Sequence, residues 1–250
     1  MFESVYTKVI SMSNRKRRKR LVNNNNTSAA TVVHVKPLTK GQENYIRAIA
    51  ENTVVLCSGP AGTGKSAVGT MLGCQYLVEG KVKKIVIARP IVSASVKTLG
   101  ALPGGVREKV DPYLIPLFEQ MNKFFGPSVV RDYISRGMIE IVPLELMRGR
   151  TFDDTFIVVD ESQNCTFEQL MMALTRIGKN SKCVLNGDLE QTDLGWKDDI
   201  NGFLDCIDLL KNTPDISIVK MTDNDIVRSP IVKSIIRALR NRDDLYKEDK

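Results

Sequence analysis

Eight consecutive residues have types and a spacing that suit the binding of nucleotide phosphates. Residues 59–66 read GPAGTGKS, which fits GxxxxGK[ST], and they follow a β-rich run and open a helical pattern. The glycines let the backbone curl until successive N–H groups point at phosphate oxygens, and the helix N-terminus adds its positive dipole end. Lys65 would reach the β- and γ-phosphates, and the Ser66 hydroxyl would ligate Mg²⁺. We expect ATP to be held by Gly59, Pro60, Ala61, Gly62, Thr63, Gly64, Lys65, Ser66 and Ala67, with Mg²⁺ at Ser66.

A pair of carboxylates supplies the second signal. Residues 156–159 form an apolar strand pattern that ends in Asp160 and Glu161. Ligands of open α/β folds bind at such a carboxyl edge. We expect Asp160 to hold Mg²⁺ through water and Glu161 to orient the water that attacks the γ-phosphate. A strand followed by Asp-Glu is a weak signal alone, but downstream of the phosphate loop it favours hydrolysis over simple nucleotide binding.

Two further segments carry polar groups that could respond to the nucleotide. Asp188 and Gln191 follow another apolar run, where either could sense the γ-phosphate, although a Gly-Asp β-turn explains the same residues. Arg228 stands at the start of the last helical pattern, where its charge is unfavourable beside the positive helix end. It is therefore a candidate arginine finger toward a neighbouring subunit, with a surface ion pair as the alternative.

Several basic residues are candidates for contact with phosphates of nucleic acid. Arg89 follows the strand pattern at 84–88, and Arg148 and Arg150 precede the strand that leads to Asp160. The alternative for each is a solvated loop charge. Residues 15–20 are all Lys or Arg and suit a phosphate backbone, but they lack interleaved aromatic side chains for base stacking. A short charge run of this kind is also typical of a solvated tail.

Composition limits the class of protein. The 250 residues are 42% hydrophobic, enough for one α/β domain. The net charge of +7 lies in residues 1–36, which hold eight Lys or Arg and one acidic residue, so the rest is neutral. Five cysteines without a CxxC pair are expected in the core of a protein in a reducing cytoplasm, and a single His argues against structural zinc. No apolar stretch reaches the length of a membrane span.

Short apolar runs alternate with helical patterns along the chain. Continuous apolar strands between helices predict an α/β fold with a mainly parallel sheet covered on both faces. The expected domains are a basic, disordered arm at 1–36, a catalytic domain at 37–241 and a charged tail at 242–250. Strands are expected at 53–58, 84–88, 139–142, 156–159, 183–186 and 216–219, and helices at 39–51, 66–78, near 106–125, 167–178, 200–211 and 230–241.

Taken together, these segments resemble the PhoH-like family of P-loop ATPases, from about residue 38 to residue 240. The compact form and the stretch SVKTLG at 95–100 are similar to bacteriophage-encoded members. The segments that carry the resemblance are 39–42, 59–66, 88–92, 99–104, 108–113, 147–151, 158–164, 174–178, 186–194 and 225–230. Two positions depart from the family pattern: Ser162 stands where Ala is usual, and Ser229 where His is usual.

The resemblance implies a single three-layer RecA-like domain that hydrolyses ATP, associates with RNA or single-stranded DNA, and forms a ring, often a homohexamer. It implies that Gln42 reads the adenine, that Gln191 couples phosphate state to movement, and that Arg228 acts in a neighbouring subunit's site. Helicase activity is a weaker implication, because one such domain needs adjacent subunits to form a motor. Two other functions stay open: a nucleotide-controlled oligomeric scaffold with little hydrolysis, and a P-loop kinase of a small molecule.

Overall fold

Six parallel strands form the centre of the computed structural model, which describes residues 34–90, 117–189, 202–235 and 238. Each neighbouring pair runs parallel, in the order β3-β2-β4-β5-β1-β6. The strands are β1 (Val54–Ser58), β2 (Lys84–Arg89), β3 (Ile139–Pro143), β4 (Thr155–Val159), β5 (Lys182–Gly187) and β6 (Ile216–Lys220). β5 therefore separates β1 from β4.

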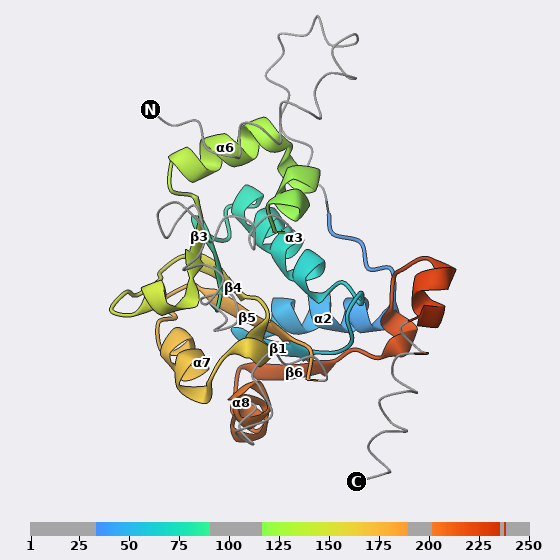
Figure 1. The fold of residues 1–250 in the computed structure, drawn as a ribbon. Helices are drawn as coiled ribbons and strands as arrows, with labels where there is room; N and C mark the ends of the chain where they lie inside the picture. The colour runs from blue at the N-terminus through green and yellow to red at the C-terminus, as the bar shows by residue number, and fades with distance from the viewer. Residues whose placement is uncertain (1–33, 91–116, 190–201, 236–237, 239–250) are drawn as a thin grey trace, which may run out of the picture.

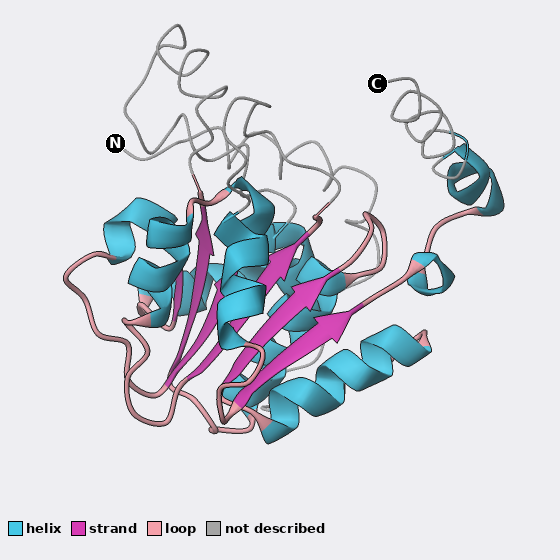
Figure 2. Ribbon diagram, turned by 90° about the horizontal axis from the view of Figure 1, so that it is seen from below, coloured by secondary structure: helices cyan, strands magenta, loops and turns pink. Residues whose placement is uncertain are grey.

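Helices cover both faces of the sheet, so the described part has three layers (Figures 1 and 2). On one face lie α2 (Lys40–Glu51) and α3 (Lys65–Val78), with residues 117–125, which are also helical, and α6 (Pro127–Ser135) toward β3. On the other face lie α7 (Phe167–Leu174) and α8 (Gly202–Leu210). Short 3-10 turns complete the elements: η2 (Leu144–Met147), η3 (Ser162–Asn164) and η4 (Asp223–Asp225).

Alternation along the buried strands divides the apolar residues into two cores. In β4, Phe156 and Val158 pack against α3, whereas Ile157 and Val159 pack under α7 and α8. β1 divides its side chains between the same two cores. Because both faces of these strands are covered, they are apolar throughout rather than alternating with polar residues. This arrangement confirms the predicted α/β fold with a parallel sheet.

Most predicted elements are observed, with three differences. The helix expected near 106–125 is described only from residue 117, and α6 was not predicted at all. The helix expected at 167–178 ends at Leu174, because Phe152 forms a β-bridge with Ile177 and accepts the amide of Gly178 at 2.8 Å. The helix expected at 230–241 begins at Pro230. The basic run at 15–20, Gln191 and the tail at 242–250 lie outside the described residues.

Two sequence expectations about residue environment can be compared with the described residues. All five cysteines are buried and unpaired. No helix in the described ranges has the length and apolar content needed to cross a membrane.

Glu140 of β3 lies between two cations from neighbouring segments. Arg150 donates two hydrogen bonds to its carboxylate, at 2.8 and 2.7 Å, and Lys84 of β2 forms an ion pair with the same group. The Arg150 hydrogen bonds, opposed by burial and aided by Lys84, lower the pKa of Glu140 to about 2. Arg150 also lies over the ring of Phe152, with the guanidinium carbon 4.6 Å from the ring centre.

We expect the Glu140 cluster to make stability depend on acid. A carboxyl whose pKa falls on folding stabilises the fold above its ordinary value of 4.5, and the contribution is lost as pH falls toward 2. Glu140→Gln should lower the free energy of unfolding at pH 7 by up to about 1 kcal/mol, since the pairs are partly exposed. Urea unfolding at pH 7 and pH 3 measures this, with the exposed Glu119→Gln as control. An equal loss at both pH values would contradict it.

Candidate nucleotide-binding site

The loop between β1 and α3 has the backbone geometry of an anion cradle. Gly62 and Gly64 have φ angles of +84° and +89°, a left-handed conformation that side chains with a Cβ rarely adopt. The Thr63 hydroxyl donates to the carbonyl of Pro60 at 2.9 Å and closes the loop on itself. Gly64 offers no side chain to cap α3, so the first N–H groups of that helix face the cavity, where an anion is favoured.

Lys65 lies inside this loop, with 9% of its surface exposed. Its ammonium group donates to the carbonyls of Gly59 and, at 2.9 Å, of Pro60. Burial lowers the pKa of Lys65, and the nearby carboxylates of Asp188 and Asp160 oppose that shift. The cation is therefore poorly solvated, and a phosphate oxygen in the same cavity would interact with it strongly.

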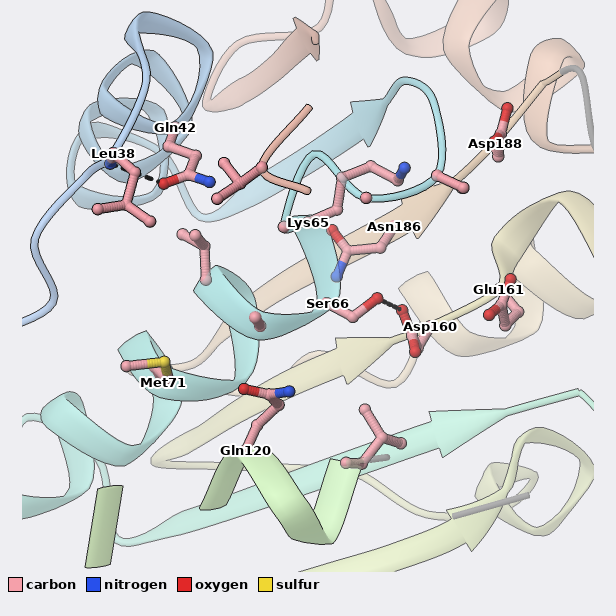
Figure 3. A pocket seen from close by; sticks show the side chains of 18 of the residues that line it. Leu38, Gln42, Lys65, Ser66, Met71, Gln120, Asp160, Glu161, Asn186 and Asp188 are labelled. Carbon is pink, nitrogen blue, oxygen red and sulfur yellow. Dashed lines mark hydrogen bonds between the residues drawn. The ribbon is translucent and has the colours of Figure 1, made fainter. Parts of the chain in front are cut away.

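Ser66 and Asp160 join the phosphate loop to the end of β4. The Ser66 hydroxyl donates to Asp160 Oδ1 at 2.6 Å, and Asp160 is 1% exposed (Figure 3). A hydroxyl beside a buried carboxylate is an oxygen donor set of the kind that Mg²⁺ accepts, with water and phosphate oxygens as its remaining ligands. No cluster of three or more His, Cys, Asp or Glu side chains suited to a metal occurs among the described residues. Ser66 and Asp160 therefore fit a metal that arrives with a phosphate ligand.

Arg89, the last residue of β2, holds the acidic pair together. Its guanidinium donates to Asp160 Oδ2 at 3.1 and 2.7 Å and to Glu161 Oε1 at 3.1 Å. Gln163 donates to the other Glu161 oxygen at 2.7 Å. Glu161 has φ of +58° and ψ of +41°, a left-handed conformation that is costly for a residue with a side chain. The strain and both hydrogen bonds fix the direction of the Glu161 carboxylate.

Gln42 connects α2 to the phosphate loop. Its side-chain nitrogen donates to the carbonyl of Thr63 at 2.9 Å, and its side-chain oxygen accepts the amide of Leu38 at 2.8 Å. Thr39 begins this helix, because its hydroxyl accepts the amide of Gln42. Gln42 lines the cavity as expected, and its observed contacts are with the loop and with the segment before the helix.

Arg228 lies over the phosphate loop of its own chain. The amide of Val227 donates to the carbonyl of Gly62 at 2.9 Å, and a Cβ on Gly62 would lie 3.0 Å from Arg228 Cγ. Asp225 supports this segment: its carboxylate accepts the amides of Gly41 at 2.8 Å and Thr222 at 2.9 Å. Burial alone would raise the pKa of Asp225, but these hydrogen bonds outweigh it and the pKa is lowered.

One cavity of about 640 Å³ brings most of the predicted residues together. Asp188 also lines it, and its amide donates to Gln163 Oε1 at 3.0 Å. Arg148 and Arg150 do not line it: Arg148 is exposed after η2, and Arg150 is paired with Glu140. The predicted residues on the cavity wall are Gln42, Ala61, Gly62, Gly64, Lys65, Ser66, Ala67, Arg89, Asp160, Glu161, Asp188 and Arg228.

Four residues that shape this site are not identified by the sequence motifs: Tyr45, Gln163, Asn186 and Asp225. Gln163 and Asn186 line the cavity, and Tyr45 and Asp225 hold other parts of the site in place. Each lies two or three positions from a predicted site residue. The sequence therefore shows only that a polar or aromatic residue lies near a motif. It does not show which side chain that residue contacts in the fold.

The sheet order and the site define the class. A phosphate loop after β1 and an acidic pair after β4, with one strand between them, are the features of a RecA-like P-loop nucleotide-binding domain. The chain belongs to the PhoH-like protein family, whose sequence profile matches residues 34–240.

Curated relatives carry the same family description. The PhoH-like proteins of Bacillus subtilis (strain 168) and Mycobacterium tuberculosis (strain ATCC 25618 / H37Rv) are 41% and 42% identical over 206 residues. Protein PhoH of Escherichia coli (strain K12) is 33% identical over 202 residues. These matches cover 82%, 82% and 80% of this chain but 63%, 57% and 56% of the relatives. The chain thus spans about six tenths of their length.

Solved structures that align with most of this chain include the large terminase from a thermophilic bacteriophage. It is 14% identical, with a TM-score of 0.47, over 81% of this chain and 50% of the terminase chain. The same terminase in complex with ADP is 15% identical, with a TM-score of 0.44, over 80% of this chain and 50% of that one.

Proposed function

We propose that this chain is a Mg²⁺-dependent ATPase whose turnover is coupled to single-stranded RNA or DNA. The observation that carries the proposal is the Ser66–Asp160 hydrogen bond, which places the phosphate loop and the acidic pair on one cavity. Lys65 and Glu161 line that same cavity. A positive cradle beside two carboxylates is the arrangement that hydrolysis of a metal-bound triphosphate requires.

The residues divide the chemistry between them. The loop amides and Lys65 bind the phosphates and neutralise charge that develops on the transferred phosphoryl group. Ser66 and Asp160 would hold the metal ion, which when bound withdraws charge from the phosphate oxygens. Glu161 would orient a water and take its proton as the oxygen attacks the γ-phosphorus. The bond to the β–γ bridging oxygen then breaks, and ADP and phosphate leave.

Arg89 is the proposed link between nucleic acid and hydrolysis. It holds a carboxylate oxygen of both Asp160 and Glu161, and it ends β2 at the edge of the sheet where the cavity opens. A nucleic-acid phosphate that competes for the guanidinium would weaken its hold on Glu161, and the carboxylate could then turn toward water. The basic run at 15–20 would add salt-dependent attraction for the same polymer.

We also propose that the chain associates with copies of itself. The family resemblance implies that the assembly is a homohexameric ring. Apolar side chains are exposed around the start of the C-terminal helix: Val227 is 40%, Ile231 66% and Ile235 51% exposed. Exposed apolar side chains close together in the sequence are favourable to cover with another protein surface. Five buried, unpaired cysteines support the expected cytoplasmic location.

Removing the charge of Lys65 should abolish turnover. We expect Lys65→Ala to slow phosphate release from ATP by about 10³-fold or more, because the transferring phosphoryl loses its cation. Glu161→Gln should slow it by about 10²- to 10⁴-fold while nucleotide still binds. A phosphate-release assay measures both, with the exposed Arg148→Ala as control. Unchanged turnover in Glu161→Gln would favour the scaffold function, and transfer of phosphate to a metabolite without release to water would favour the kinase.

Single-stranded RNA should stimulate ATP turnover, and salt should remove the stimulation. The polymer's phosphates release counterions when they bind cationic side chains, so affinity falls steeply between about 50 and 200 mM salt. We expect Arg89→Ala to lose more of the stimulation than Arg148→Ala. Turnover measured with RNA, with single-stranded DNA and with neither distinguishes the two polymers. Turnover that neither polymer alters at low salt would contradict the coupling.

Mixing two inactive variants tests where Arg228 acts. If Arg228 completes a neighbour's site, as the resemblance implies, Lys65→Ala and Arg228→Ala subunits mixed together should regain activity. Arg228 contacts Gly62 of its own chain, so we expect no recovery, because each variant chain then lacks one part of its own site. Phosphate release from the mixture, compared with each variant alone, gives the answer. Substantial recovery would show that Arg228 acts across a subunit boundary.

A further inference from the structure

Asn186 presents a buried hydrogen-bond donor to the cavity. It lies near the end of β5, is 1% exposed and lines the cavity. Its side-chain nitrogen has no hydrogen-bond partner among the residues that the structure describes. Figure 3 shows this nitrogen on the side of the amide that faces Ser66. A buried N–H group without an acceptor is unfavourable, and nearly all buried polar groups in native proteins are hydrogen-bonded, so this one requires an explanation.

The strand register places Asn186 between the two motifs of the site. Asn186 pairs with Cys57 of β1, two residues before the phosphate loop begins. On the other side, Leu185 pairs with Val159 of β4, so Asn186 is level with Asp160. An acceptor that reaches the Asn186 amide therefore lies where the phosphate loop and the acidic pair meet. Beside a positive cradle, that acceptor is a phosphate oxygen rather than a neutral group.

Tyr45 of α2 fixes the orientation of this amide. Its hydroxyl donates to Asn186 Oδ1 at 2.6 Å, and Tyr45 is fully buried. Burial, with further contributions from Cys57 and Asp160, raises the pKa of Tyr45 well above its ordinary value, so the hydroxyl keeps its proton. With its oxygen occupied by that donor, the amide keeps its nitrogen on the side that faces Ser66 and Gly69 of α3.

Gly69 of α3 leaves the space that this pair needs. A Cβ at Gly69 would lie 3.2 Å from the Asn186 nitrogen and 3.2 Å from the Tyr45 hydroxyl. Three elements, α2, α3 and β5, thus meet around a single hydroxyl–amide hydrogen bond.

We propose that Asn186 donates to an oxygen of the terminal phosphate of the bound nucleoside triphosphate, and that Tyr45 is the positioning residue that holds the amide for this contact. The inference deepens the proposed ATPase function and depends on it. The pair would distinguish a triphosphate from a diphosphate, because only the triphosphate carries the acceptor.

The test compares the affinities of two fluorescent nucleotides, ADP and the non-hydrolysable β,γ-imido analogue of ATP, for the full chain with Mg²⁺. Asn186→Leu removes the donor at similar size and should weaken binding of the imido analogue about tenfold or more, as expected for a lost hydrogen bond to a charged group. ADP affinity should change less than about twofold. Tyr45→Phe should weaken the imido analogue by a smaller factor with ADP again unchanged, and Tyr133→Phe on α6 is the matched control.

The outcomes separate this inference from the proposed function. Equal weakening of both nucleotides by Asn186→Leu, or no weakening of either, would overturn the terminal-phosphate contact while leaving the ATPase proposal in place. Failure of the unaltered chain to bind either nucleotide would overturn both. If Asn186→Leu lowers the melting temperature too far for titration, Tyr45→Phe decides: a ratio of the two affinities equal to that of the unaltered chain would then refute the proposal.

Discussion

The hydrogen bond between Ser66 and Asp160 depends on the order of three strands. Ser66 belongs to the first turn of α3 and Asp160 follows β4, and β5 lies between β1 and β4. Parallel strands end at one edge of the sheet, so the loop after β1 and the acidic pair after β4 open on the same side. α3 packs over the sheet against β4, so its first turn with Ser66 lies on the side of the sheet toward Asp160. Without this strand order, the cradle and the carboxylates would form two separate sites.

Local sequence predicted the strands and the phosphate loop well, because their signals lie in adjacent residues. Apolar runs buried on both faces and a glycine-rich turn are visible without knowledge of the fold. α6 is not evident from the sequence although its apolar residues share one face: it has only nine residues, and Val130 alone among them is buried. The range expected for α7 extends past Leu174 because the β-bridge between Phe152 and Ile177, which ends the helix, joins residues far apart in the sequence. Tertiary contact, not helix propensity, decides where that helix ends.

Within the site, what sequence could not supply is the pairing of side chains. Tyr45 and Asn186 are 141 residues apart, and Gly41 and Asp225 are 184 residues apart. The position of Arg89 at the end of a strand predicts contact with a phosphate, yet in the structure it donates to the two carboxylates that the sequence assigns to hydrolysis. Motif residues thus indicate which chemistry is present, whereas the restraints on that chemistry come from residues that the topology brings together.

The amide of Val227 donates to the carbonyl of Gly62 inside the phosphate loop, and the C-terminal helix begins three residues later. Asp225 anchors the same segment to the start of α2. The segment is therefore held at two points, one on the phosphate loop and one at the start of α2. A rearrangement of the loop around Gly62 would therefore have to break the Val227 hydrogen bond or displace the start of the C-terminal helix with it.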